Sequence, residues 1–255
     1  MDMPEFGSSF FWLIMFLIMV GSFVSASAGF GFAILLVAAL QFFIPTVELV
    51  GVIIILGCVG ASLRVIETRK IGNWKRSLHF IIPAFFGVPL GVAVLKYLDP
   101  ILMKRYLNLA LLAGVLMLAY SMSGRHHLVS GGTRKKSIIE PFVGFISGFL
   151  GGSCTLSGPP IVIWGVLSGW KKMEMHTLWA RFFFSIAFFS LINLGLQGMY
   201  KRPTIILSLF LIPAVFIGFR IGTWVRDRIT ERRFRIYVLI FLFLSGLTGL
   251  AMSFS

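Results

Sequence analysis

The chain has 255 residues, of which 58% are hydrophobic and only 13% are charged, and its mean hydropathy is +0.95. A soluble domain carries roughly 25% charged residues, so this composition excludes a soluble globular protein and a disordered one. The net charge is +14, and the cations lie in short segments between apolar runs, which indicates the positive-inside bias of a membrane protein rather than nucleic-acid binding. The length of the apolar runs favours helices. The sequence therefore predicts an all-α, polytopic membrane protein.

Eight apolar blocks follow one another along the chain, at about 9–44, 47–63, 77–98, 106–122, 138–168, 177–199, 204–225 and 236–254. Six of them are close to the roughly 20 residues of one membrane span, whereas the first and the fifth are too long for one ordinary helix. Each of these two contains a glycine-rich interruption, and the fifth also contains two prolines. Glycine and proline break helices, and broken backbone within a membrane is stable only inside protein or beside a wet cavity. We therefore expect two re-entrant helical hairpins.

The distribution of lysine and arginine between the blocks tests this topology. If every block is one crossing, the two sides of the membrane receive 10 and 11 cations, whereas with two hairpins they receive 16 and 5. The positive-inside rule favours the second arrangement, which has six full spans and both termini outside. It divides the chain into a first repeat, 1–124, a basic cytoplasmic linker, 125–137, and a second repeat, 138–255.

The second half of the chain repeats a pattern of the first. The segment HFIIPAFF at 79–86 matches LFLIPAVF at 209–216 at five of eight positions. Both segments are followed by glycines at four-residue spacing, namely Gly87 and Gly91, then Gly218 and Gly222. Three crossings in each half predict that the halves are inverted relative to each other. Inverted repeats with broken helices at their centre are typical of secondary transporters.

These features resemble the TauE/SafE sulfite-exporter family. The run GFISGFLGGSCTLSGPP at 144–160 resembles the second-repeat signature of that family, and SASAGFGFAILL at 25–36 resembles the first-repeat version. The triple glycine of the usual pattern is absent from both, and Ser153, Cys154 and Thr155 stand in place of the third glycine of the second repeat. The resemblance covers nearly the whole chain. It implies export of sulfite, of an organosulfonate such as sulfoacetate, or of a related small anion.

The two interruptions are the predicted substrate site. A helix that begins again within the membrane has unpaired N–H groups at its N-terminus, and these groups and the helix dipole attract anions. Serine and threonine hydroxyls add donors. The alternative is that the glycines only allow close helix crossing and the hydroxyls bond back to carbonyls. The predicted contacts are Ser25, Ser27, Gly29 and Gly31 in the first interruption, and Gly151, Gly152, Ser153, Cys154, Thr155 and Ser157 in the second.

Three polar residues outside the interruptions are further candidates for substrate binding. Arg220 follows 16 apolar residues and Arg181 precedes 18, so each is expected within the membrane or at its edge. A guanidinium suits a sulfonate because it can bond two oxygens, and the alternative is snorkelling to lipid headgroups. Asn193 lies one turn before Gln197 on the same face of its block, where it either lines the path or forms an interhelical hydrogen bond.

The acidic residues bear on what drives transport. All nine lie at block ends or in loops, so the sequence does not support a carboxylate proton relay or a Na⁺ site built on acids. A membrane potential that is negative inside favours outward anion movement by about 2.3 kcal/mol per charge per 100 mV. We therefore expect potential-driven efflux, with modulation by His79 or His176 at block edges.

Alternative functions and partners remain open at this point. The alternatives are an anion channel, a carrier of other small organic anions, import of the same anion, and an intramembrane enzyme. No enzyme is expected, because no nucleophile and base are adjacent in the sequence. No metal or other cofactor is expected either, since Cys58 and Cys154 lie inside apolar blocks and no metal-ligand spacing occurs. The expected partners are a small anion and the lipid of the inner membrane, with a homodimer left open and no nucleic acid.

Overall fold

The computed structural model describes residues 9–69, 74–122, 133–170 and 172–226, which form nine α-helices and no strand. In chain order these are α1 (Ser9–Ala28), α2 (Phe32–Leu40), α3 (Thr46–Thr68), α4 (Trp74–Tyr97), α5 (Pro100–Met122), α6 (Thr133–Cys154), α7 (Gly158–Leu167), α8 (Lys172–Leu196) and α9 (Arg202–Val225). The all-α fold expected from the composition is confirmed. Helix α6 takes in residues 133–137 of the predicted linker, because lysine and arginine are good helix formers.

Six helices of the described part, α1, α3, α4, α5, α8 and α9, are long and apolar enough to cross a membrane. Between 33% and 50% of each apolar window is buried, so much of the apolar surface faces outward, as it does in a protein surrounded by lipid. The chain is therefore a multi-pass membrane protein. These are not the six predicted spans, because α1 belongs to a block assigned wholly to a hairpin. The predicted span at 236–254 lies outside the described residues.

Both long blocks are broken where the sequence predicted an interruption. The first splits into α1 and α2, and Gly29 and Gly31 between them have φ of +86° and +104°. The fifth splits into α6 and α7, and Thr155 at that break has φ of +64°. Glycine adopts positive φ readily, whereas a β-branched residue does so only with strain. In each block the short second helix packs against the longer first one.

Glycines let two pairs of helices pack with their backbones in contact. Helix α4 packs against α6, where a Cβ on Gly148 would lie 2.4 Å from the carbonyl oxygen of Ala84. Helix α9 packs against α1 in the same way, with Gly218 so close to Met19 that a Cβ would lie 2.2 Å from its carbonyl oxygen. Small residues at helix crossings are the usual means of close association in membranes.

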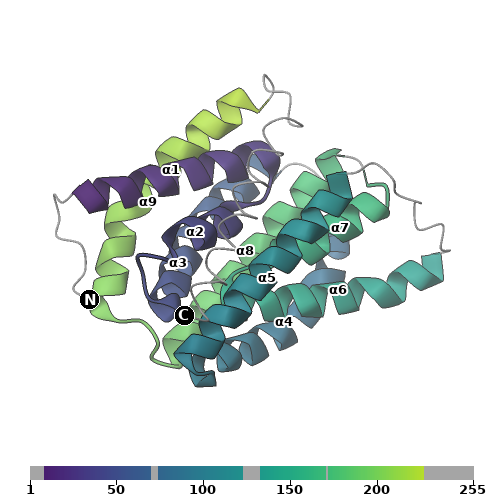
Figure 1. Ribbon diagram of the computed structural model, residues 1–255. Helices are drawn as coiled ribbons and strands as arrows, with labels where there is room; N and C mark the ends of the chain where they lie inside the picture. The colour runs from purple at the N-terminus through teal and green to yellow at the C-terminus, as the bar shows by residue number, and fades with distance from the viewer. Residues whose placement is uncertain (1–8, 70–73, 123–132, 171, 227–255) are drawn as a thin grey trace.

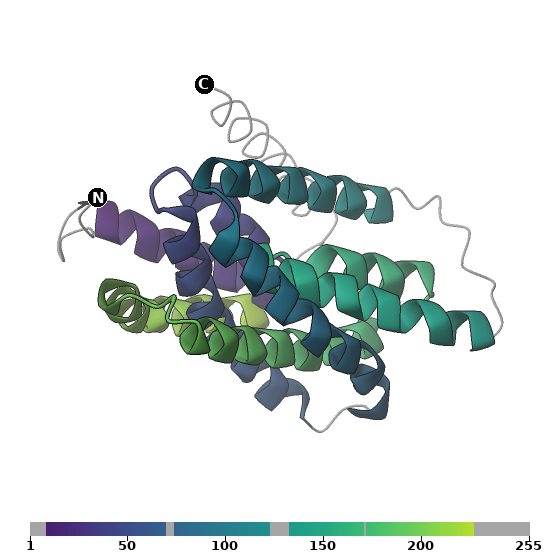
Figure 2. The same ribbon diagram turned by 90° about the horizontal axis from the view of Figure 1, so that it is seen from below.

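The two glycine-rich pairs join the predicted halves crosswise. Helix α4 of the first half packs on the broken block of the second, and α9 of the second half packs on the broken block of the first. Helices α3 and α8 pack against each other between these pairs (Figure 1). In both views α1 and α6 lie on opposite sides of the molecule (Figure 2). Two halves related by a two-fold axis would pack on each other in this reciprocal way. The inversion of one half relative to the other stays a prediction.

Ion pairs at both ends connect α3 to α9. Near the start of α3, Glu48 accepts a hydrogen bond of 2.8 Å from Lys201, and near its end Glu67 pairs with Arg226. The two helices therefore run side by side in the same direction. Exposed ion pairs contribute only about 0–1 kcal/mol, so their main effect here is to fix the register of α3 against α9.

Candidate functional site

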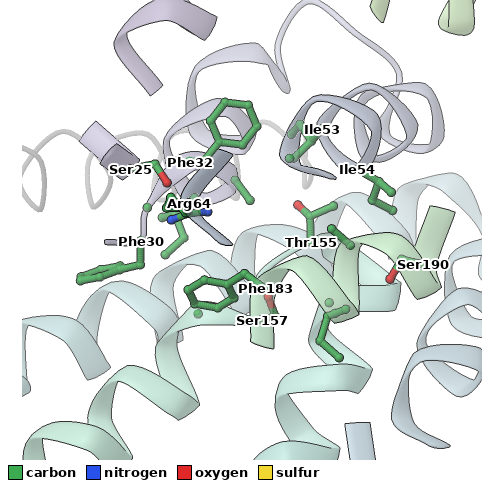
Figure 3. A pocket seen from close by; sticks show the side chains of 18 residues that line it. Ser25, Phe30, Phe32, Ile53, Ile54, Arg64, Thr155, Ser157, Phe183 and Ser190 are labelled. Carbon is green, nitrogen blue, oxygen red and sulfur yellow. The ribbon is translucent and has the colours of Figure 1, made fainter. Parts of the chain in front are cut away.

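A cavity of about 80 Å³ lies where the two helix interruptions meet α3 and α8 (Figure 3). A single water needs roughly 10–15 Å³, so this cavity has room for a small ligand of several non-hydrogen atoms. Its charged, hydroxyl-bearing and glycine lining consists of Ser25, Gly31, Gly57, Arg64, Gly151, Thr155, Ser157, Gly158 and Ser190. Its apolar lining consists of Phe30, Phe32, Ala33, Ile34, Ile53, Ile54, Phe183, Ile186 and Ala187.

Arg64 of α3 gives the cavity its positive charge. The residue is only 8% exposed, and its Nη1 donates a hydrogen bond of 2.8 Å to the carbonyl oxygen of Gly29. Its guanidinium carbon lies 5.8 Å from the centre of the Phe183 ring, and the side chain lies between Ser25 and Phe183 (Figure 3). A guanidinium has five N–H donors, so the bond to Gly29 leaves others for a ligand. Because a buried charge is costly, an anion that binds directly to the guanidinium would be favoured in the cavity.

Two buried hydroxyls on the cavity wall have no hydrogen-bond partner among the described residues. Ser25 of α1 is 5% exposed and Ser190 of α8 is 1% exposed, and the Oγ of each is unpaired. Buried polar groups in proteins are nearly always hydrogen-bonded. Two unpaired hydroxyls on one cavity therefore indicate that a ligand or water supplies the missing partners.

The N-terminus of α2 adds backbone donors to the same cavity. The Leu35 N–H donates to the Gly31 carbonyl oxygen at 3.0 Å, and the three preceding N–H groups of α2 have no acceptor within the helix. Those three belong to cavity-lining residues. Helix α7 also begins at the cavity, but Pro159 and Pro160 in its first turn lack an N–H. The donors therefore come mainly from α2 and Arg64.

Five of the ten contacts predicted within the interruptions line the cavity, namely Ser25, Gly31, Gly151, Thr155 and Ser157. A sixth, Gly29, supports the cavity indirectly because its carbonyl oxygen holds the Arg64 side chain. The structure thus brings residues from both interruptions together around one space, as the sequence predicted. That they bind substrate stays a prediction.

The other residues of the interruptions lie outside the cavity lining. Ser27 and Cys154 donate to carbonyl oxygens of their own helices. Ser153 lies 2.8 Å from the hydroxyl of Tyr106 on α5, and Gly152 packs against the backbone of α4. Ser153 and Gly152 therefore hold the second broken block against α5 and α4, whereas Ser27 and Cys154 bond within their own helices. The contribution of all four to binding stays a prediction.

The candidates outside the interruptions do not line the cavity either. Arg181 of α8 is 2% exposed and its guanidinium carbon lies 4.9 Å from the ring centre of Trp74. Arg220 is exposed on α9, and the Asn193 amide donates to a carbonyl oxygen of its own helix at 3.2 Å. Their part in binding also stays a prediction.

Arg64 and Ser190 line the cavity but were not among the residues predicted from the sequence. Arg64 was counted among the cations of a loop, although it follows Ile53 and Gly57 at the spacing of one helix face. Ser190 follows Phe183 at the same seven-residue spacing. In each helix, one face carries small and apolar residues and then one polar residue before the helix ends. This pattern is the signal that could have identified both residues.

Substitution of Thr155 tests the strain at the second interruption. We expect Thr155→Gly to be more stable than Thr155→Ala by about 1 kcal/mol, because both lose the hydroxyl but only glycine adopts the native φ of +64° without strain. Thermal unfolding of the two variants in the same detergent measures the difference. Equal melting temperatures would show that the break relaxes away from this conformation when threonine is removed.

The comparisons with known proteins gave one match. The family model described as Sulfite exporter TauE/SafE matches residues 13–249 of the chain. Neither the curated proteins nor the solved structures gave a match. The matched range includes both interruptions and every residue that lines the cavity.

Proposed function

The chain belongs to the TauE/SafE family of sulfite exporters, and on this premise we propose that it exports sulfite or an organosulfonate such as sulfoacetate by alternating access. The family and the six apolar helices indicate a transporter of sulfur anions rather than an enzyme. The anion binds in the cavity between the two helix interruptions. The observation that carries this assignment is Arg64, a buried guanidinium that lines the same cavity as two unpaired hydroxyls and the start of α2.

The proposed orientation places the cation-rich loops in the cytoplasm and both termini outside the inner membrane. In this orientation α3 and α9 both run toward the cytoplasm. Their parallel packing supports the topology, since the ion pairs connect start to start and end to end. A potential that is negative inside then favours export of the bound anion.

Ser25→Ala tests whether the cavity binds the anion. Sulfite should raise the melting temperature of the unaltered protein, and the variant should bind sulfite about tenfold more weakly, because a hydrogen bond to a charged group contributes about 1.5–3 kcal/mol. Without sulfite the variant should be no less stable than the unaltered protein, since the lost hydroxyl has no partner. Melting temperature as a function of sulfite concentration measures both effects.

Ser147→Ala is the matched control for this experiment. Ser147 is also fully buried with an unpaired Oγ, but it lies on α6 outside the cavity lining. Its removal should leave sulfite affinity unchanged. Failure of sulfite and of organosulfonates to stabilise the unaltered protein, or equal affinity in the two variants, would contradict the proposed site.

A further inference from the structure

We propose that the cavity selects its anion by charge state, taking a monoanion and rejecting a dianion. This inference rests on the proposed function and narrows it, because it states which form of the substrate is carried and removes sulfoacetate, which is a dianion, from the organosulfonates proposed above. Sulfite would be carried as hydrogensulfite, and an organosulfonate would be carried only when it has no second acidic group. The inference follows from the charges around the cavity.

Arg64 is the one charged side chain among the described residues that line the cavity. Among the described residues, Glu67 and His176 are charged or titratable groups close to Arg64 or to the Gly29 carbonyl that it binds. Glu67 follows one turn later on α3 and is paired with Arg226, so this pair adds no net charge. His176 of α8 lies against Gly29, where a Cβ would be 3.1 Å from its Nε2, and it does not line the cavity.

The helix dipoles at the two interruptions add little net charge. The start of a helix carries about +0.5 of an elementary charge and its end about −0.5. The C-terminus of α1 faces the N-terminus of α2 across the first break, and α6 and α7 meet in the same way at the second. Each positive end is therefore offset by a negative end close by. The net positive charge available to a ligand is that of Arg64, about +1.

Among the described residues, the part of the cavity away from the guanidinium offers no second cation. Ser190 and Ile54 lie on that side, and Arg64 and Ser25 lie on the other (Figure 3). A second negative charge, whether on the same sulfur group or at the far end of a longer molecule, would be desolvated without a counter-charge, which is strongly unfavourable. A neutral hydroxyl suits Ser190 instead, because a serine hydroxyl both donates and accepts hydrogen bonds.

Two matched pairs of anions test the inference on the purified protein at constant ionic strength. Methanesulfonate and sulfate are alike in shape but carry one and two charges, and isethionate and sulfoacetate share a two-carbon sulfonate skeleton but end in a hydroxyl and a carboxylate. Within each pair the monoanion should bind at least about tenfold more tightly, because the buried extra charge has no partner. Concentration-dependent shifts of the melting temperature give both affinities.

The pH dependence of sulfite binding is a second test of the inference, because sulfite loses its second proton near neutral pH. Its apparent affinity should fall by about tenfold for each pH unit above that ionisation, as the monoanion fraction falls. Methanesulfonate keeps one charge throughout, so its affinity at each pH reports any titration of the protein, including that of His176. We expect the sulfite curve to fall relative to this control.

The outcomes separate this inference from the proposed function. Equal affinity for sulfate and methanesulfonate, or a sulfite affinity that does not change with pH relative to the control, would overturn charge-state selection and leave anion binding at Arg64 intact. Binding of neither monoanion nor dianion would overturn the proposed function together with the inference. Tighter binding of both monoanions and a falling sulfite curve would support it.

Discussion

Gly148→Ala should lower the free energy of unfolding by about 3 kcal/mol, because a single added methyl group would separate α4 from α6. Its Cβ would lie 2.4 Å from the carbonyl oxygen of Ala84 and 2.6 Å from its Cα. Both are backbone atoms, which cannot turn away as the end of a flexible side chain can. The two helices must move apart along their whole contact, so the packing at Gly144 and Gly152 is lost as well. Thermal unfolding of the purified variant in detergent measures the effect.

Gly60→Ala on α3 is the matched control. Its Cβ would lie 3.6 Å from a methyl group of Val215, which is ordinary van der Waals contact. Alanine is a better helix former than glycine by up to about 1 kcal/mol, so this variant should be as stable as the unaltered protein or slightly more stable. Equal melting temperatures of the Gly148→Ala and Gly60→Ala proteins would show that α4 and α6 are not in backbone contact.

The glycines show how much of this packing can be read from a sequence. The four-residue spacing of Gly87 and Gly91, and of Gly218 and Gly222, is visible in the sequence, and in the structure each of these glycine pairs contacts another helix closely. The identity of each partner could not be predicted. A glycine indicates that another backbone lies close to it, but it does not indicate which one. That α4 packs on α6 and α9 packs on α1 depends on the packing of all the helices together.

The helix breaks could be predicted from the sequence, whereas the directions of the charged side chains could not. Clusters of glycine and proline act on the backbone locally, so both interruptions lie where the sequence predicted them. An arginine near a helix end, in contrast, can point to headgroups or back into the protein, and the sequence gives its position but not its direction. Arg220 was predicted within the membrane or at its edge as a substrate contact, and it is exposed on α9 outside the cavity lining, whereas Arg64 was counted with a loop and is buried in the cavity.

Arg64→Gln should lower the affinity for sulfite and the rate of sulfite export by about 100-fold or more, because loss of one member of a buried charge pair costs about 2–5 kcal/mol. Glutamine keeps a polar side chain at this position but is two atoms shorter than the Nη1 that donates to the carbonyl oxygen of Gly29, so that hydrogen bond is lost. The folded protein should survive the change, because removal of a buried charge offsets the lost hydrogen bond. Sulfite-dependent melting and efflux from proteoliposomes measure the two losses separately.

Arg220→Gln distinguishes a site at Arg64 from a general effect of positive charge. It removes the same charge from α9, where the side chain is exposed and does not line the cavity, so affinity and export should be unchanged. Loss of binding in Arg220→Gln with full binding in Arg64→Gln would instead place the anion at the arginine that the sequence predicted. Arg64→Lys refines the comparison, because lysine keeps the charge but not the fork that bonds two oxygens. An intermediate affinity in that variant would mean that the geometry of the guanidinium, as well as its charge, holds the anion.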